Sequence, residues 1–312
     1  MVDWVAVVLA KKEGTYGVDS APTAAANAIL TRNYSAKPVD MDRIERNLDT
    51  RVFGALASVP SNERRTSGYE VEIAGSGTAG TAPAWMELLE ACGMAAPLVT
   101  VGQDAVQTFA APGVAASSLS QYDFLSDQRR KAVGMVGSFT MDFTAGAYPF
   151  IGFTWMGLIP TVSPFDKSAP GVPDLARWKQ PLEVNLDNTD FLLDGYAPAL
   201  RSWRADAGVA TVMRNLVGKR YVRRGNHSFT STAVIEAPDV ATKNYIQSLR
   251  KGDLVAWSIE HGVTPGNIFQ ASSAKVQITD ITESNEDDTL MWTMALRHTV
   301  EGGAADFTIT AK

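Results

Sequence analysis

Alternation of apolar and polar residues is the feature that most constrains what this chain can fold into. Over residues 135–143 the two kinds of side chain take alternate positions, which places them on opposite faces of an extended strand. Residues 150–159 repeat the pattern, and the intervening segment 144–149 contains Gly146 and Pro149, which favour a turn. We therefore predict a β-hairpin here and a chain that is mainly β.

The first half of the chain shows three further elements. Alternation over residues 69–73 predicts a strand with one acidic face. A short helix is predicted over residues 81–93, because Thr81 and Pro83 suit a helix start and an apolar stripe recurs at helical spacing before a glycine. Residues 98–101 then predict another strand.

The second half repeats this order of elements. Its predicted strands lie at residues 229–236, 254–259, 274–281 and 289–297. Between the first two, Asp239 caps a predicted helix that Gly252 ends. The tripeptide Arg46-Asn47-Leu48 also returns as Arg214-Asn215-Leu216. The shared order favours an internal duplication.

A proline-rich stretch over residues 159–173 separates the two similar halves. We predict a first domain over residues 1–160 with an N-terminal arm, a linker over 161–173 and a second domain over 174–312. The expected fold class is mainly β with short helices (α+β), arranged as two tandem β-sandwich domains.

The composition excludes several classes of protein. Hydrophobic residues make up 45% of the chain and charged residues 20%, which suits an ordinary globular protein. The single cysteine, Cys92, cannot build a disulfide framework. The apolar run at residues 4–10 is shorter than the roughly 20 residues of a membrane span, so we expect neither an anchor nor a signal peptide. The net charge of −6 argues against tight binding of nucleic acid, since that affinity comes from Lys and Arg.

One segment matches a nucleotide-binding motif. Residues 75–80 read G-S-G-T-A-G, lie between a predicted strand and a predicted helix, and precede Asp104 at a spacing suited to a ribose-binding carboxylate. However, the chain has hairpin strands where a doubly wound fold needs alternating strands and helices. A loop is the favoured interpretation, and a nucleotide-dependent enzyme stays as an alternative.

No other motif points to catalysis, a cofactor or a metal. The three histidines, at 227, 261 and 298, are scattered, and no serine lies in a G-x-S-x-G elbow. The spacing of cysteine and histidine does not suit zinc, and the acidic run at residues 283–288 lacks the calcium-loop pattern. Cys92 lies on the apolar stripe of the predicted helix, which favours a buried position. We predict that the protein is not an enzyme and uses no cofactor.

Charged residues supply the candidate contact sites. Basic clusters occur at residues 129–131 and 219–224, and a further arginine pair precedes the first acidic strand. In an acidic chain we interpret them as docking sites for acidic patches on a neighbouring subunit, with nucleic-acid contact as the alternative. The predicted inter-subunit contacts are Arg64, Arg65, Arg129, Arg130, Arg223 and Arg224. The acidic residues Glu70, Glu72 and Asp142 fall on the polar faces of predicted strands.

Segments in a fixed order along nearly the whole chain carry a family resemblance. They are E-G-T-Y-G-V-D-S-A-P-T at 13–23 with N-A-I-L at 27–30, E-R-N-L at 45–48, G-S-G-T-A-G-T-A-P-A-W-M-E-L-L-E-A-C-G-M at 75–94, the hairpin at 137–157, and residues 188–198 and 238–259. Together they resemble the major tail tube proteins of long-tailed, siphophage-type bacteriophages. No single segment is diagnostic, and their order carries the resemblance.

The resemblance implies a tube domain built as a β-sandwich with a short helix, whose inner sheet joins those of its neighbours into a β-barrel around a lumen. Family rings present six such domains, so a chain with two implies a homotrimeric ring with pseudo-sixfold symmetry. Stacked rings would form the tail tube, through which duplex DNA passes without specific binding. In this setting Glu70, Glu72 and Asp142 become candidates for the lumen wall.

The resemblance also implies partners and a location. The chain would bind copies of itself, the tape measure protein, and the tail terminator and distal tail proteins, and it would assemble in the bacterial host cytoplasm into the virion tail. The N-terminal arm, residues 1–39, and a loop at 52–67 are the expected ring-to-ring contacts. A two-domain β-sandwich that binds glycans, such as an adhesin module, is the alternative from another class of protein.

Overall fold

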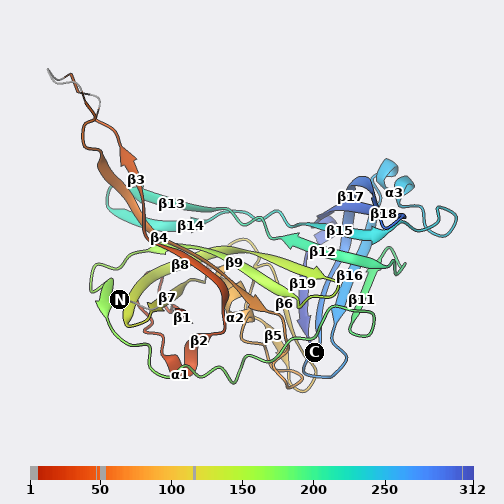
Figure 1. The fold of residues 1–312 in the computed structure, drawn as a ribbon, viewed down its shortest axis with the longest axis horizontal. Helices are drawn as coiled ribbons and strands as arrows, with labels where there is room; N and C mark the ends of the chain where they lie inside the picture. The colour runs from red at the N-terminus through yellow and green to blue at the C-terminus, as the bar shows by residue number, and fades with distance from the viewer. Residues whose placement is uncertain (1–5, 47, 50–53, 115–116, 304) are drawn as a thin grey trace.

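The computed structural model describes residues 6–46, 48–49, 54–114, 117–303 and 305–312 (Figure 1). It is 52% strand and 7% helix, which confirms the prediction of a mainly β protein. The strands of the first half are β1 (Ala6–Lys12), β2 (Ala28–Ile29), β3 (Arg32–Ile44), β4 (Val59–Glu72), β5 (Leu98–Thr100), β6 (Asp104–Thr108), β7 (Leu119–Leu125), β8 (Gln128–Thr144) and β9 (Phe150–Leu158).

The remaining elements follow in chain order. The later strands are β10 (Phe165–Lys167), β11 (Thr189–Leu193), β12 (Leu200–Asp206), β13 (Thr211–Leu216), β14 (Lys219–Arg224), β15 (Thr230–Glu236), β16 (Leu254–His261), β17 (Phe269–Glu286), β18 (Thr289–His298) and β19 (Thr308–Ala311). The helical segments are α1 (Ala24–Asn27), α2 (Met86–Ala91), α3 (Tyr245–Lys251) and the single turn η1 (Glu301–Gly303).

One long antiparallel sheet runs through both halves of the chain. Its strands pair in the order β3, β4, β9, β8, β12, β15, β18 and β17. In Figure 1 this sheet forms the upper layer of the body, and the β3–β4 hairpin projects from one end of it. We call it the long sheet.

Shorter sheets lie beneath it. Under the first half, β2, β1, β7 and the start of β8 pair in that order, and β10 flanks β8. Under the second half, the order is β11, β16, the start of β17, β19, β6 and β5. β8 and β17 are long enough to belong to both layers, so they connect the layers covalently.

The core fills the space between the layers. Alternate residues of the strands in the long sheet point into it, as the period-two pattern predicts. One contiguous cluster of buried side chains spans both halves and includes Trp85 of α2, Phe139, Phe153, Trp203 and Trp257. The single cysteine, Cys92, is fully buried there, and burial raises the pKa of its thiol.

The two halves share one pattern of pairing. β1 pairs with β7 as β11 pairs with β16, and β4 pairs with β9 as β15 pairs with β18. The pairs β7–β8 and β16–β17 also carry matching β-bulges, with an extra residue between Ala132 and Met135 of β8 and between Ser273 and Val276 of β17. Strands of the two halves also pair with each other, β12 with β8 and β19 with β6, so the division into two domains stays a prediction.

One local prediction needs correction, and the structure adds detail to two others that remain predictions. The second helix begins after Asn244, whose side chain accepts from the N–H of Gln247, whereas Asp239 forms a preceding turn. The proline-rich linker contains β10, which pairs with β8. Within the predicted N-terminal arm, residues 6–12 form β1, which lies between β2 and β7 with Val8 fully buried; residues 1–5 lie outside the described part.

Candidate assembly surface

The solvent-facing side of the long sheet brings together all three predicted acidic residues. One row of directly opposed residues crosses seven strands, in the order Glu72, Phe150, Asp142, Arg204, Thr232, Ala295 and Asp280. The neighbouring row runs through Glu70, Gly152, Thr140, Asp206, Thr230 and Arg297. Strands that are distant in sequence thus build one continuous polar face, which we call the polar face.

Ion pairs neutralise two of the predicted acids. The Glu70 carboxylate accepts from Nε of Arg32 at 2.7 Å and from the side-chain amide of Asn33 at 2.8 Å. The Asp142 carboxylate lies 2.7 Å from Nε of Arg204, and its other oxygen accepts from the hydroxyl of Thr144. The polar face therefore carries charges of both signs with a modest acidic excess, instead of a uniformly acidic surface.

Four of the six predicted arginine contacts lie on three elements: the β3–β4 hairpin, β8 and β14. Arg64 lies on the β3–β4 hairpin, 3.0 Å from both Asp40 and Asp42; hydrogen bonds from Asn62 and Arg64 lower the pKa of Asp42. Arg129 donates two hydrogen bonds to Asp166, at 2.8 and 2.5 Å, which lower the pKa of that carboxyl. Arg130 lies beside Arg129, opposite Phe165 of β10, and Arg223 is exposed on β14.

Arg224, the fifth, is half-buried. Its guanidinium donates to the carbonyl of Glu90 at 3.3 Å and lies against Gly93, and burial lowers its pKa. The basic residues of β14 therefore point partly to solvent and partly into the body. The arginines do not form a single patch.

Arg65 is the exception among the predicted contacts. Its side chain is 0% exposed and pairs with Asp123 at 2.6 Å, and it also donates to the carbonyl of Lys37. We therefore assign Arg65 a role inside the chain and omit it from the contact surface. The sequence contained the signal for this, since Arg65 is in phase with Tyr69 and Val71, which point into the core.

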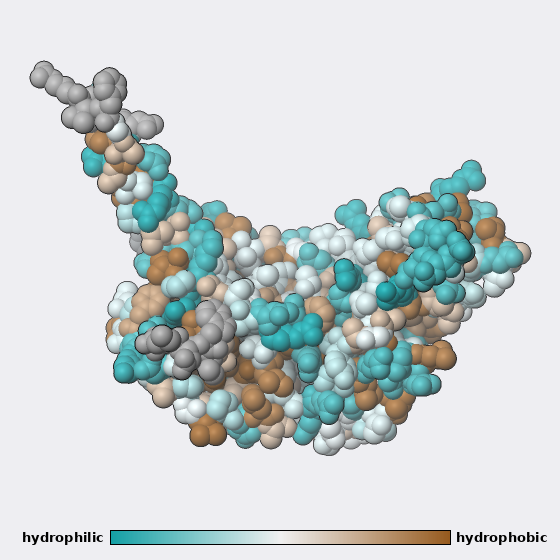
Figure 2. Space-filling view, in the orientation of Figure 1, coloured by the Kyte–Doolittle hydropathy of each residue, from teal (hydrophilic) through white to brown (hydrophobic). Residues whose placement is uncertain are grey.

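Two hairpins lie outside the layered body, and the β3–β4 hairpin projects away from it. The β3–β4 hairpin, whose strands end at Ile44 and begin again at Val59, lies near the β13–β14 hairpin, and the two are linked by a hydrogen bond between the side chains of Asn62 and Asn215 (Figure 1). Both expose apolar side chains, including Ile44, Val59 and Val217. Figure 2 shows brown, apolar atoms on the projecting hairpin as well as teal ones. These exposed apolar side chains are available for contact with another chain.

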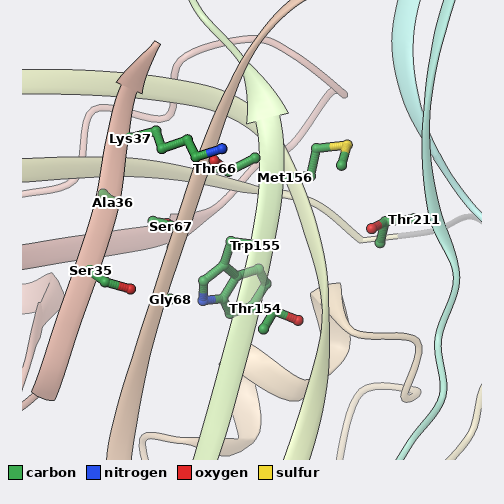
Figure 3. A pocket seen from close by; sticks show the side chains of 10 residues that line it. All are labelled: Ser35, Ala36, Lys37, Thr66, Ser67, Gly68, Thr154, Trp155, Met156 and Thr211. Carbon is green, nitrogen blue, oxygen red and sulfur yellow. The ribbon is translucent and has the colours of Figure 1, made fainter. Parts of the chain in front are cut away.

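A hollow of about 550 Å³ lies where the two hairpins leave the polar face. Figure 3 shows its lining from β3, β4 and β9, with Thr211 at the far side. The lining consists of small, hydroxyl and apolar groups, and Lys37 is its only charged side chain among the described residues. Such a lining suits contact with another protein chain better than it suits a catalytic site.

The glycine-rich segment at 75–80 is explained by close backbone contacts. A Cβ on Gly75 would lie 2.1 Å from the carbonyl oxygen of Gly266, and one on Gly80 would lie 2.3 Å from the backbone nitrogen of Gly102. The N–H of Gly77 donates to the same Gly266 carbonyl at 2.9 Å. The glycines therefore allow the loop at 75–80 to pack closely against the loops at Gly266 and Gly102. The helix that follows has only six residues, so this segment is a packed loop.

The candidate metal ligands and the histidines among the described residues are dispersed. Within them, no three His, Cys, Asp or Glu side chains are grouped so that they could hold a metal ion. The three histidines serve separate contacts, with Asp306, Thr189 and Ser231 respectively. No helix in the described part of the chain has the length and apolar character needed to cross a membrane.

A continuous polar sheet face and a projecting β3–β4 hairpin are features suited to contacts with other chains. Comparison with known families agrees: residues 4–311 match the model of the phage tail tube protein family, and the chain belongs to that family. No curated protein matches it.

Membership of the family settles the class of function. The protein is a structural, non-enzymatic component of the phage virion tail, and its family implies self-assembly into a tube. The glycan-binding and nucleotide-dependent alternatives are therefore set aside.

Proposed function

We propose that three copies of this chain close into a ring, each contributing two tube-like halves, residues 1–160 and 174–312. Rings stack into a hollow tube, and duplex DNA leaves the virion through its lumen. Assembly takes place in the bacterial host cytoplasm, the tape measure protein sets the length of the tube, and the tail terminator and distal tail proteins bind its two ends.

The observation that carries this proposal is the continuity of the long sheet across the two halves. β8 of the first half pairs directly with β12 of the second, so the sheet passes from one half to the next without a break. The halves repeat one pairing pattern, which supports six equivalent units from three chains. Closure of the ring would also remove the open edges of the sheet, which otherwise invite uncontrolled pairing.

The polar face is the proposed lumen wall. Glu70, Glu72 and Asp142 lie on it, and Arg32 and Arg204 neutralise two of these acids. Duplex DNA carries about one negative charge per 1.7 Å of its axis, so a wall rich in unpaired Lys and Arg would bind it tightly. A wall of paired charges with a small acidic excess lets DNA slide.

The β3–β4 and β13–β14 hairpins are the proposed ring-to-ring contacts. The β3–β4 hairpin projects from the body and the β13–β14 hairpin lies along it; both expose apolar residues and border the hollow shown in Figure 3. Of the predicted loop at 52–67, residues 59–67 belong to β4, while 52 and 53 lie outside the described residues. A second contact surface of this kind turns closed rings into an open-ended stack.

Electron microscopy of the concentrated, purified protein tests the proposal. We expect stacked rings with a central channel, formed either spontaneously or after addition of purified tail tips as an initiator. Chains that stay dispersed at high concentration even with tail tips present would contradict it.

A further inference from the structure

The junction between the two halves inside the chain is a template for the contact between two chains. β12 joins the long sheet by pairing with the C-terminal end of β8. We propose that β3 of one chain pairs with the C-terminal end of β17 of a neighbouring copy, in the register that β12 keeps with β8. This inference rests on the proposed function, because it applies to chains that join into a ring.

The bulges in β8 and β17 align the two halves residue by residue. Met135 of β8 and Val276 of β17 are the first paired positions after the bulges. The next residues along these strands, Val136 and Gln277, face Met156 of β9 and Arg297 of β18. Met156 in turn faces Thr66 of β4, and Arg297 faces Thr230 of β15. Each threonine is followed by a serine, so sequence and pairing give the same alignment.

The alignment extends to the outer strands. Lys37 of β3 faces Thr66, and Asp206 of β12 faces Thr230. Two residues back along these strands, Ser35 therefore corresponds to Arg204.

Counting along β9 and β18 from the aligned residues Met156 and Arg297 identifies the partner position on β17. Six residues back along β9 and β18 lie Phe150 and Met291, which face Asp142 of β8 and Ser284 of β17. Ser284 therefore corresponds to Asp142. Because Asp142 lies opposite Arg204 inside the chain, Ser35 of one chain is placed opposite Ser284 of the next.

Both strands have an open edge where this contact would form. Among the described residues, β3 pairs with β4 alone, and β17 from Ile281 onward pairs with β18 alone. An open edge presents unpaired N–H and C=O groups, which are a template for another strand. The two edges lie at opposite ends of the long sheet, so each chain offers one edge to each neighbour.

The hydrogen-bond pattern of the template defines the geometry of the key pair. At the β8–β12 junction, the N–H of Ala207 donates to the carbonyl of Phe139, and the N–H of Ala145 donates to the carbonyl of Arg201. Hydrogen-bonded pairs alternate with non-hydrogen-bonded ones, so the Arg204 pair is non-hydrogen-bonded. Its counterpart, Ser35 with Ser284, would have Cα atoms about 4.5 Å apart, within reach of a disulfide.

The side chains at the two junctions differ in a way that suits their roles. Inside the chain, Trp203 packs on Phe143 with ring centroids 5.7 Å apart. At the junction between chains, the position of Met141 is taken by Glu283, which accepts a hydrogen bond from Nε1 of Trp292 at 3.3 Å. An inward-facing charge on an edge strand discourages indiscriminate pairing, so the junction between chains forms only when the whole ring supports it.

Cysteine cross-linking tests the register. The variants Ser35→Cys and Ser284→Cys are prepared separately and mixed before assembly; the native Cys92 is fully buried and gives no background. We expect oxidation of the mixed tubes to link chains in pairs, and oxidation of either variant alone to leave them unlinked. A chain with both substitutions should give linked species up to the closed ring.

A shifted pair is the matched control. Mixing Ser35→Cys with Glu286→Cys places the two thiols two residues out of register, where diagonal Cα atoms are about 7–8 Å apart and a disulfide is at least about tenfold less frequent. If tubes form normally and the mixture with Ser284→Cys gives no higher cross-linking yield than the mixture with Glu286→Cys, the proposed register is wrong. The proposal that the protein forms a tube would still hold in that case. Wild-type chains that form no rings would contradict the proposed function itself.

Discussion

At the scale of single residues, the neighbours Arg64 and Arg65 have different roles, because Arg65 pairs with Asp123 inside the core and Arg64 lies at the surface. The side chains of Arg65 and Asp123 are both buried, so removing one partner leaves an uncompensated charge in the core. We expect Arg65→Met to lower the free energy of unfolding by about 3–5 kcal/mol. The adjacent Arg64→Met loses only partly exposed ion pairs and should lower it by about 1 kcal/mol or less. Urea denaturation of unassembled chains measures both, and equal losses would contradict the assignment.

His298 gives a prediction of pH dependence. It is buried beside Phe229 and Phe307, and burial lowers its pKa to about 4 from the ordinary 6.5. As the pH falls below 6.5, the unfolded chain takes up a proton that the folded chain does not, so stability decreases. At pH 5 the loss from this residue is about 2 kcal/mol.

The variant His298→Gln isolates that contribution. It keeps a polar group near the hydroxyl of Ser231, which His298 contacts at 2.8 Å, but it does not titrate. Unfolding midpoints at pH 7.5 and pH 5 should differ less in the variant than in the wild type. The same pH slope in both chains would show that His298 does not contribute.

Residue-scale properties were predictable where they depend on local alternation. The polar positions of Glu70, Glu72 and Asp142 follow from the period of a strand. The neutralisation of Asp142 by Arg204 does not, because the two residues meet only through pairing between the halves.

At the scale of elements, β17 is the strand whose composition controls association. Replacing Glu283 by Met gives this edge the residue that β8 has at Met141, which is buried at the junction inside the chain. We expect Glu283→Met to lower the protein concentration at which tubes appear, measured by light scattering. Glu286→Gln, at the exposed end of the same strand, serves as the control. A higher threshold for Glu283→Met would contradict the template.

The β3–β4 hairpin makes a separate prediction. Joining Ile44 to Val59, which face each other, through a short Asn-Gly turn would remove the distal part of the hairpin while keeping the paired strands. We expect folded chains that form single rings and fail to stack, as seen by electron microscopy. Normal tubes from this variant would assign the ring-to-ring contact elsewhere.

Element positions followed from sequence more readily than element pairing did. Strands and the apolar stripe of α2 have strong periodic signals, whereas both Asp239 and Asn244 suit a helix start and local propensity cannot choose between them. β10 was missed because its three residues lie among prolines and show no alternation. The order of the long sheet depends on contacts between distant strands, which no local pattern encodes.

At the scale of the whole molecule, the lumen assignment predicts an effect of charge on DNA release. Glu72→Lys in phage should leave the tubes intact but slow genome ejection, because added cations hold the phosphates, and high salt should restore the rate. Glu72→Gln is the neutral control. If Glu72→Lys does not change the rate of genome ejection at low salt, Glu72 does not line the lumen.

The family resemblance could be recognised from ordered segments of sequence, and its match over residues 4–311 establishes the class of protein. The number of chains per ring is a property of the assembly, so it depends on the angle at which two long sheets meet and not on any motif.

The measurement that tests the central claim most directly is a cryo-electron microscopy reconstruction of the tube. We expect three chains of 33.5 kDa per ring, related by threefold symmetry with six similar lobes. Six full-length chains per ring would contradict the account.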